Sequence, residues 1–188
     1  MRSTKNFQEM IDNYQGGDLD LSGCDLKSVT LDHVDGSLNL SKANIGTLEI
    51  GYVSRELNMA NATVKKIVNP IDAESVIMTG ASIKKLPAHV YTNYFDISKS
   101  NITKLCSDVR VNTFNMRNTK LEQFPKEMNV RRLIVDTKTA KNLSLNLINQ
   151  CESIEMDGTS YSRMTSGDWS SFEFCSVNSS ETCTCGAC

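Results

Sequence analysis

The sequence has few features that would direct the protein to a membrane, to nucleic acid or out of the cell. No apolar stretch approaches the roughly 18 residues of a membrane span, and the N-terminal MRSTKNFQEM has no apolar run typical of a secretory leader. The formal net charge of −2 argues against a broad basic surface for nucleic acid or anionic membranes, although it allows local patches. We therefore expect a cytoplasmic protein, in its own cell or in a host cell, without nucleic-acid or membrane partners.

Motifs for catalysis and metal binding are also missing. There is no phosphate-binding G-x-x-x-x-G-K-[S/T] motif and no G-x-S-x-G nucleophile motif. The two histidines, His33 and His89, are too few for a three-histidine metal site, and we interpret them as partly exposed side chains with ordinary hydrogen bonds. These absences favour a protein that is not an enzyme and that uses no cofactor.

The sequence does contain a repeat of 19 residues. If the first residue of a unit is position 0, apolar residues recur at positions 0, 2, 7 and 10. Six units fit this template, a seventh is weaker, and an eighth follows after 21 residues; the units begin at Leu19, Leu38, Leu57, Val76, Phe95, Phe114, Leu133 and Ile154. Such regularity is typical of a solenoid, in which each unit buries its apolar side only by stacking on its neighbours.

The spacing within a unit predicts the path of one coil. Residues at positions 0 and 2 share one face of an extended strand, and those at 7 and 10 return to the same interior after a bend. Position 5 is mostly small, which suits a tight inward turn: Cys24, Ala43, Ala62, Ala81, Ser100, Thr119, Lys138 and Thr159. Position 14 is a further inward position: Tyr52, Ile71, Val90, Val109, Met128 and Leu147. The remaining length leaves no room for a long helix, so we expect extended chain or short 3₁₀ turns there.

The unit resembles the leucine-rich repeat. The family consensus, L-x-L-x-x-[N/C]-x-L-x-x-L, matches LDLSGCDLKSV from Leu19 to Val29, and Leu86-Pro87 and Phe124-Pro125 resemble short bacterial repeats. The resemblance implies an α/β solenoid with a short parallel sheet on its concave face and little helix on its convex side. The unit is shorter than the family's usual length of about 20–29 residues, and after the first unit the family's asparagine position is occupied by Ala, Ser, Thr or Lys. A different parallel β-solenoid, with triangular coils, is the alternative.

Different segments are expected to cover the two ends of the stack, 17–165. In residues 1–16, one face of an amphipathic helix is predicted by apolar residues at helical spacing: Phe7, Met10, Ile11 and Tyr14. Asn6 and Glu9 form a potential capping box, and Gly16-Gly17 ends this capping helix. In residues 166–188, Trp169, Phe172 and Phe174 are candidates to cover the last coil.

Six of the seven cysteines fall into two groups. Cys24 and Cys106, inside the repeat, are interpreted as small buried apolar residues. Near the C-terminus lie Cys175, Cys183, Cys185 and Cys188, which we expect to be free thiols in a reducing compartment; zinc binding and disulfide formation are the alternatives.

The surface with most functional potential is the outward side of the strands, at positions 1 and 3. Its second half is charged, and we predict a contact surface for a partner protein there: Asp96, Asn115, Arg117, Arg131, Arg132, Asp136 and Asp157. We therefore predict a non-catalytic module that binds another protein through the concave strand face, as an inhibitor or effector does. The alternative is a carbohydrate-binding or carbohydrate-active solenoid, in which Asp136 and Asp157 supply the paired carboxylates of a retaining glycosidase.

Overall fold

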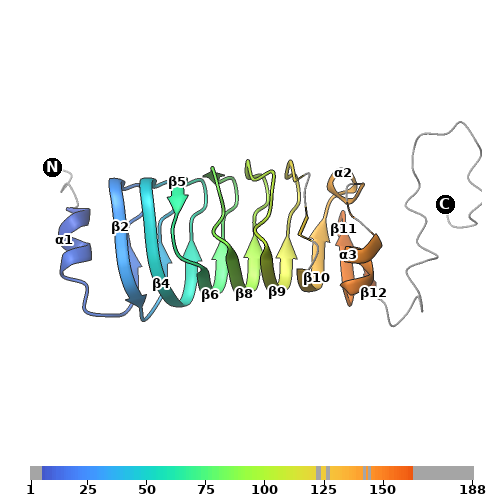
Figure 1. Cartoon of the computed structure of the whole chain (residues 1–188), viewed down its shortest axis with the longest axis horizontal. Coiled ribbons are helices and arrows are strands. Elements are labelled where there is room, and N and C mark those ends of the chain that lie inside the picture. Colours follow the sequence, from blue (N-terminus) through green and yellow to red (C-terminus); the bar gives the residue numbers. More distant parts are fainter. Residues whose placement is uncertain (1–5, 122–123, 126–127, 142, 144, 163–188) are drawn as a thin grey trace, which may run out of the picture.

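The computed structural model describes residues 6–121, 124–125, 128–141, 143 and 145–162. These residues form a β-solenoid of about seven coils, stacked in a nearly straight row between the helix α1 (Phe7–Asp12) and the hairpin of the last two strands (Figure 1). No helix in this part of the chain has the length and apolarity to cross a membrane.

One side of every coil contributes a strand to a continuous parallel ladder. Its strands are β1 (Leu19–Asp20), β3 (Leu38–Asn39), the end of β4 (Asn44–Asn58), β6 (Ile71–Ile77), β8 (His89–Asp96), β9 (Asp108–Asn115), β10 (Met128–Val135) and β11 (Ser153–Met156). Leu38 pairs with Leu57 and Val76 with Phe95, each 19 residues on. The predicted period is therefore the physical register of the stack.

The eighth unit departs from the repeat after its strand. Leu133 pairs with Ile154, 21 residues later, and β11 then turns back into the antiparallel β12 (Thr159–Ser162). Asp157 and Gly158 make this turn with positive φ angles of 51° and 87°. Thr159, expected to point inward, is exposed because the chain reverses there instead of continuing around a coil.

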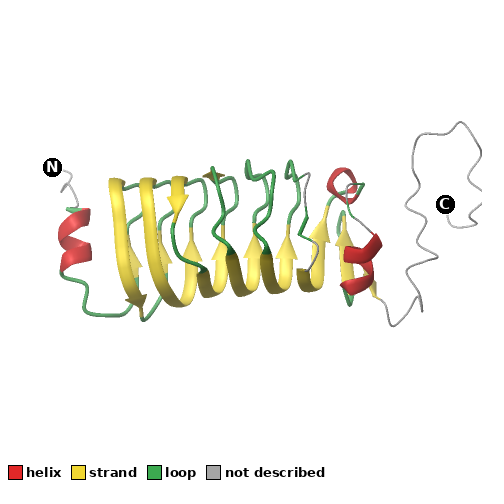
Figure 2. Ribbon diagram, in the orientation of Figure 1, coloured by secondary structure: helices red, strands yellow, loops and turns green. Residues whose placement is uncertain are grey.

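Other sides of the coils also contain strands. β2 (Asp25–Val34) pairs in parallel with β4, β4 with β5 (Thr63–Ile67), and β5 with β7 (Ser82–Ile83). Besides α1, the described helices are the short α2 (Thr137–Ala140) and α3 (Leu145–Gln150), near the C-terminal end (Figure 2). The extended chain expected away from the main ladder is confirmed, and the described residues form a β-solenoid rather than an α/β one.

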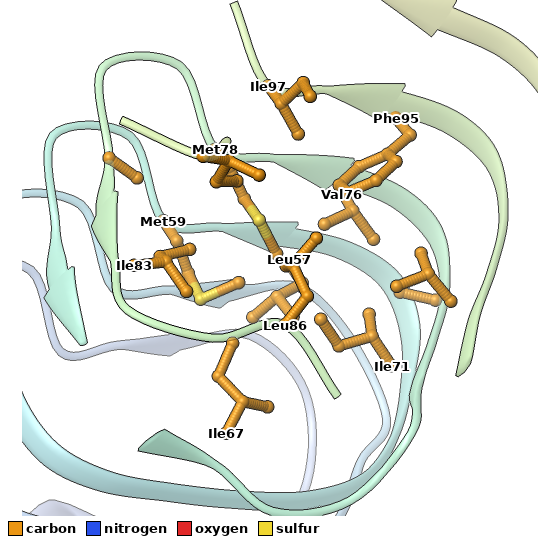
Figure 3. Packing of buried hydrophobic residues seen from close by; sticks show 14 of the residues in the cluster. Leu57, Met59, Ile67, Ile71, Val76, Met78, Ile83, Leu86, Phe95 and Ile97 are labelled. Carbon is orange, nitrogen blue, oxygen red and sulfur yellow. The ribbon is translucent and has the colours of Figure 1, made fainter. Parts of the chain in front are cut away.

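The core is a continuous column of apolar side chains inside the coils. Figure 3 shows Leu57, Met59 and Ile67 of one coil meeting Val76, Met78 and Ile83 of the next. The small position 5 is buried from Cys24 to Thr119, as expected, whereas Lys138 is exposed and Thr139 is buried beside it. Burial of this column is the dominant favourable term for the fold, at roughly 25 cal/mol per Å² of apolar surface.

Position 14 is buried in the later coils, but the prediction for Tyr52 is wrong. Tyr52 is 38% exposed, and the next residue, Val53, points inward in its place. The cause is a bulge in β4: Val53 pairs with Ala73 but Glu56 pairs with Ser75, so β4 has one extra residue between these pairs. A bulge shifts the alternation of side chains by one position, which turns the tyrosine outward.

Each coil leaves the ladder through the same tight turn. The N–H of position 5 donates to the carbonyl of position 2, as in Cys24 to Leu21 (3.2 Å) and Ala43 to Leu40 (3.1 Å). Position 4 has a positive φ in six successive units: Gly23, Lys42, Asn61, Gly80, Lys99 and Asn118. A left-handed third residue is what a type II turn requires, so small residues at position 5 accompany a backbone turn of fixed shape.

At the N-terminus the expected helix is present. The Asn6 side chain accepts a hydrogen bond from the Glu9 N–H (3.3 Å), and four apolar side chains pack partly buried against the core: Phe7, Met10, Ile11 and Tyr14. Trp169, Phe172, Phe174 and the four C-terminal cysteines lie outside the described residues.

Candidate binding surface on the strand face

The strand face is the outward side of the main ladder, formed by positions 1 and 3 of the coils and the residue before each position 0. Two predicted contact residues, Asp96 and Asn115, occupy position 1 of adjacent coils. Asn115 Nδ2 donates to Asp96 Oδ2 (2.9 Å), and Asp96 Oδ1 accepts from the Ser98 N–H (2.7 Å). Only 9% of Asp96 is exposed.

The same bond recurs along the stack. In several coils the side-chain oxygen of position 1 accepts a hydrogen bond from the backbone N–H of position 3. The acceptor and donor pairs are Asp20 with Ser22, Asn39 with Ser41, Asn58 with Ala60 and Asn115 with Arg117. Asn39 also donates to Asp20 (3.0 Å) between coils. Asx side chains commonly bond the backbone two residues on, so position 1 holds the turn and is less available to a partner than expected.

Arg117 and Arg132 meet on one carboxylate. Arg132 Nη2 donates to Glu155 Oε2 (2.7 Å), and Arg117 Nη2 donates to Glu155 Oε1. Because Asn115 pairs with Ile134 and Ile134 with Glu155, the Arg117 side chain reaches across the intervening coil of β10. Arg117 Nε is buried without a hydrogen-bond partner among the described residues.

The charges at this cluster do not balance. Two guanidinium groups face a single carboxylate, whose side chain is 18% exposed, while that of Arg132 is 50% exposed. The hydrogen bond from Arg132, outweighing the opposing effect of desolvation, holds the pKa of the Glu155 carboxyl below its usual range. Taken alone, these three groups carry a net positive charge, and Arg132 has donors turned toward solvent; Asp96, Asp136 and Asp157 add carboxylates to the same face. Glu155 was not among the predicted site residues. It could have been included from the sequence, because it occupies position 1 of the strand face two coils after Asn115.

The other predicted arginine is compensated separately. Arg131 binds Glu152 through two hydrogen bonds of 3.0 Å, from Nε and Nη2, and both side chains are exposed. Exposed pairs of this kind contribute roughly 0–1 kcal/mol to stability. Arg131 thus adds little net charge to the strand face.

Asp136 and Asp157 act as local hydrogen-bond acceptors. Asp136 caps α2 by accepting from the Thr139 N–H (2.9 Å), and it also accepts from the N–H of Asn118. Desolvation alone would raise the pKa of the Asp136 carboxyl, but these bonds outweigh it and lower that pKa. Asp157 accepts from the N–H (3.2 Å) and hydroxyl of Thr137.

This arrangement determines what chemistry the surface can support. A general acid needs a carboxyl with a raised pKa, and the pKa of Asp136 moves the other way. Within the described ranges there is no cluster of three or more histidine, cysteine or acidic side chains able to hold a metal ion. The strand face can instead offer two arginines to a planar anionic group such as a carboxylate.

A second polar cluster, which the sequence did not reveal, lies on β8 and β9. The Tyr91 hydroxyl donates to Asp108 Oδ2 (3.0 Å), His89 Nδ1 lies 3.4 Å from the same oxygen, and Arg110 Nε donates to Oδ1 (3.2 Å). The His89 and His33 side chains are about half exposed, as expected. His89 and Asp108 share one repeat position, and Tyr91 and Arg110 another, so aligning the units could have brought the four together.

No family model, curated protein or solved structure matches the chain.

Proposed function

We propose that the protein is a non-catalytic binding module that attaches to a partner protein through the C-terminal half of its strand face. The observation that carries this proposal is the sharing of Glu155 by Arg117 and Arg132. A carboxylate on the partner would pair with the half-exposed Arg132 beside Arg117, and bidentate arginine–carboxylate bonds are among the stronger polar contacts in interfaces. The rigid stack also presents these groups with little loss of conformational entropy on binding.

The repeat type belongs to this proposal as well. Support for a leucine-rich repeat comes from the L-x-L spacing that starts each unit, as at Leu19 and Leu21. Support for another class of parallel β-solenoid comes from the long β2 and β4 strands on the other sides of the coils. We favour a binding role under either type, because the strand face is the same in both.

A carbohydrate-active site has weaker support. Its two proposed carboxylates, Asp136 and Asp157, each accept hydrogen bonds from threonine and backbone groups. A cytoplasmic location and a role as inhibitor or effector are compatible with a small binding module and stand as parts of the proposal.

A paired capture experiment tests the function. The intact protein and the Arg117→Glu/Arg132→Glu variant are immobilised at equal density and exposed to lysate of the source cells. Lys27→Glu/Arg55→Glu, which makes the same change in net charge at exposed positions elsewhere, is the control. We expect a protein that is retained by the intact chain and the control and lost from the strand-face variant.

Folding must be checked because Arg117→Glu and Arg132→Glu would place two further carboxylate groups near Glu155. A milder Arg117→Gln/Arg132→Gln variant with an unchanged melting temperature should still lose at least tenfold in affinity. Equal retention by all variants would contradict the proposed face.

A further inference from the structure

Five lysines gather on another side of the solenoid, which we call the lysine face: Lys65, Lys66, Lys84, Lys85 and Lys104. The parallel pairing of Thr63 with Ser82 and of Val64 with Ile83 places Lys65 in line with Lys84 and Lys66 in line with Lys85. Lys104 follows Lys85 by one period, and all five side chains are exposed. The face therefore carries lysine columns with a spacing of about 4.8 Å along the stack.

The positive charges of the lysine face are not compensated locally. In the described part of the chain, none of the five lysines forms an ion pair. The flanking positions in the same three coils carry no charge: Thr63, Ser82 and Asn101 on one side, Val68, Pro87 and Cys106 on the other. In the sequence, Glu122 and Gln123 replace lysine at these repeat positions in the next unit.

A cavity of about 540 Å³ opens between two coils of this face. The coils are joined at both ends of the opening: Asn101 Nδ2 donates to Ser82 Oγ (3.0 Å), and the Asp108 N–H donates to the Ala88 carbonyl (3.3 Å). Pro87 lacks an N–H and cannot extend the pairing between them. Apolar side chains line the cavity, namely Ile83, Leu86, Ile102 and Leu105, and three lysines of the face, Lys84, Lys85 and Lys104, also line it.

We propose that the lysine face is a docking site for an acidic peptide segment that places one apolar side chain in this cavity. Charge complementarity to five lysines that form no ion pair with the residues that the structure describes requires several carboxylates, and the apolar part of the lining favours a leucine-sized anchor between them. A single nucleic-acid strand fits less well, because the lining contains no aromatic or arginine side chain on which bases stack. This site is separate from the strand face, so the test of this proposal is independent of the test of the proposed function.

The probes are three fluorescently labelled molecules of equal charge, titrated into the full-length protein. They are the peptide EEELEEE, the peptide EEESEEE and a six-phosphate thymidine oligonucleotide. We expect EEELEEE to bind at least fivefold more tightly than either of the other two, with an affinity that falls as salt rises.

Variants of the protein separate the charge from the cavity. Lys84→Gln/Lys85→Gln should weaken EEELEEE binding at least tenfold, whereas Arg55→Gln/Lys138→Gln, with the same loss of charge at exposed positions away from the lysine face, should change it less than twofold. Thr103→Trp, at an exposed residue that lines the cavity, keeps every lysine and should abolish the preference for leucine over serine.

Each variant is compared with the intact chain by thermal melting. Undetectable binding of EEELEEE, equal binding of all three probes, or a leucine preference that survives Thr103→Trp would each overturn the proposal.

Discussion

The side-chain amide of Asn115 donates a hydrogen bond of 2.9 Å to the carboxylate of Asp96, which occupies the same place one coil earlier. Both residues lie on the outward side of the strands and look from the sequence like surface positions. This hydrogen bond and the equivalent bonds in other coils show that part of this side stabilises the stack. Partner recognition therefore depends on the residues that remain, chiefly the arginines bound to Glu155.

Removing the Asp96 carboxylate should destabilise the fold. Asp96→Ala leaves the buried Ser98 N–H and the Asn115 amide without their acceptor, which costs about 1–3 kcal/mol. Asp96→Asn keeps an acceptor for Ser98, as Asn39, Asn58 and Asn115 do at this position in other coils, and should cost less. Urea unfolding curves of the three proteins measure this difference; equal stability of the alanine variant would show that position 1 does not hold the turn.

Position 4 should reject β-branched side chains. Lys99 has a φ of 57°, in the left-handed region where a side chain branched at Cβ is strained. Lys99→Val should therefore lower the free energy of unfolding by about 1–2 kcal/mol. The matched change Lys104→Val, at an exposed lysine outside that region, should stay within about 0.5 kcal/mol, and a similar loss in both variants would argue against the proposed turn.

The cysteines inside the coils should be unreactive in the native protein. Burial raises the pKa of the Cys106 thiol to about 11 and that of Cys151 to about 12, and burial also raises the pKa of Cys24. Since the thiolate is the reactive form, iodoacetamide at pH 8 should leave these three unmodified and should label them after denaturation. Peptide mass spectrometry reads both states, and rapid native labelling of Cys106 would show that its coil is open.

Acid should weaken the fold partly through Glu155. The pKa of its carboxyl is lower in the folded than in the unfolded state, so the unfolded state binds more protons as the pH falls. The contribution is complete above the unfolded pKa of about 4.3 and is lost as the pH falls through the lower folded value. Urea unfolding at pH 7, 5, 4 and 3 should show a smaller acid loss in Glu155→Gln than in the intact protein. An unchanged pH dependence would indicate that the arginine pair does not stabilise this carboxylate.

The stacking of the coils could be predicted from the sequence because burial requires apolar or small residues at the same positions of every unit. Leu38 and Leu57 are both apolar because they occupy the same buried place in successive coils, where they also pair. Ala43 and Ala62 are small because the turn leaves no room for larger side chains. Tyr52 escaped prediction because one bulged residue in β4 changes which side chain points inward, and neither residue type nor spacing records a bulge. The hairpin after β11 escaped because Ile154 still carries the apolar signal of a full unit.

The candidate surfaces were harder to predict. Alternation shows that Asp96 points outward, but it does not show that its oxygens already accept hydrogen bonds from Ser98 and Asn115. The lysine face was hidden by the net charge of the whole chain, and it becomes visible only when Lys65, Lys84 and their neighbours are aligned by repeat position.

Arginine footprinting tests the binding account most directly. The protein is treated with phenylglyoxal, alone and saturated with a protein captured through it, and the modification rate of each arginine is measured by mass spectrometry. Arg132 is half exposed in the free chain, and Arg55 and Arg110 are exposed elsewhere on the solenoid. The account predicts that the bound partner slows modification of Arg132 at least fivefold and leaves Arg55 and Arg110 unchanged. Unchanged modification of Arg132 in the complex would contradict it.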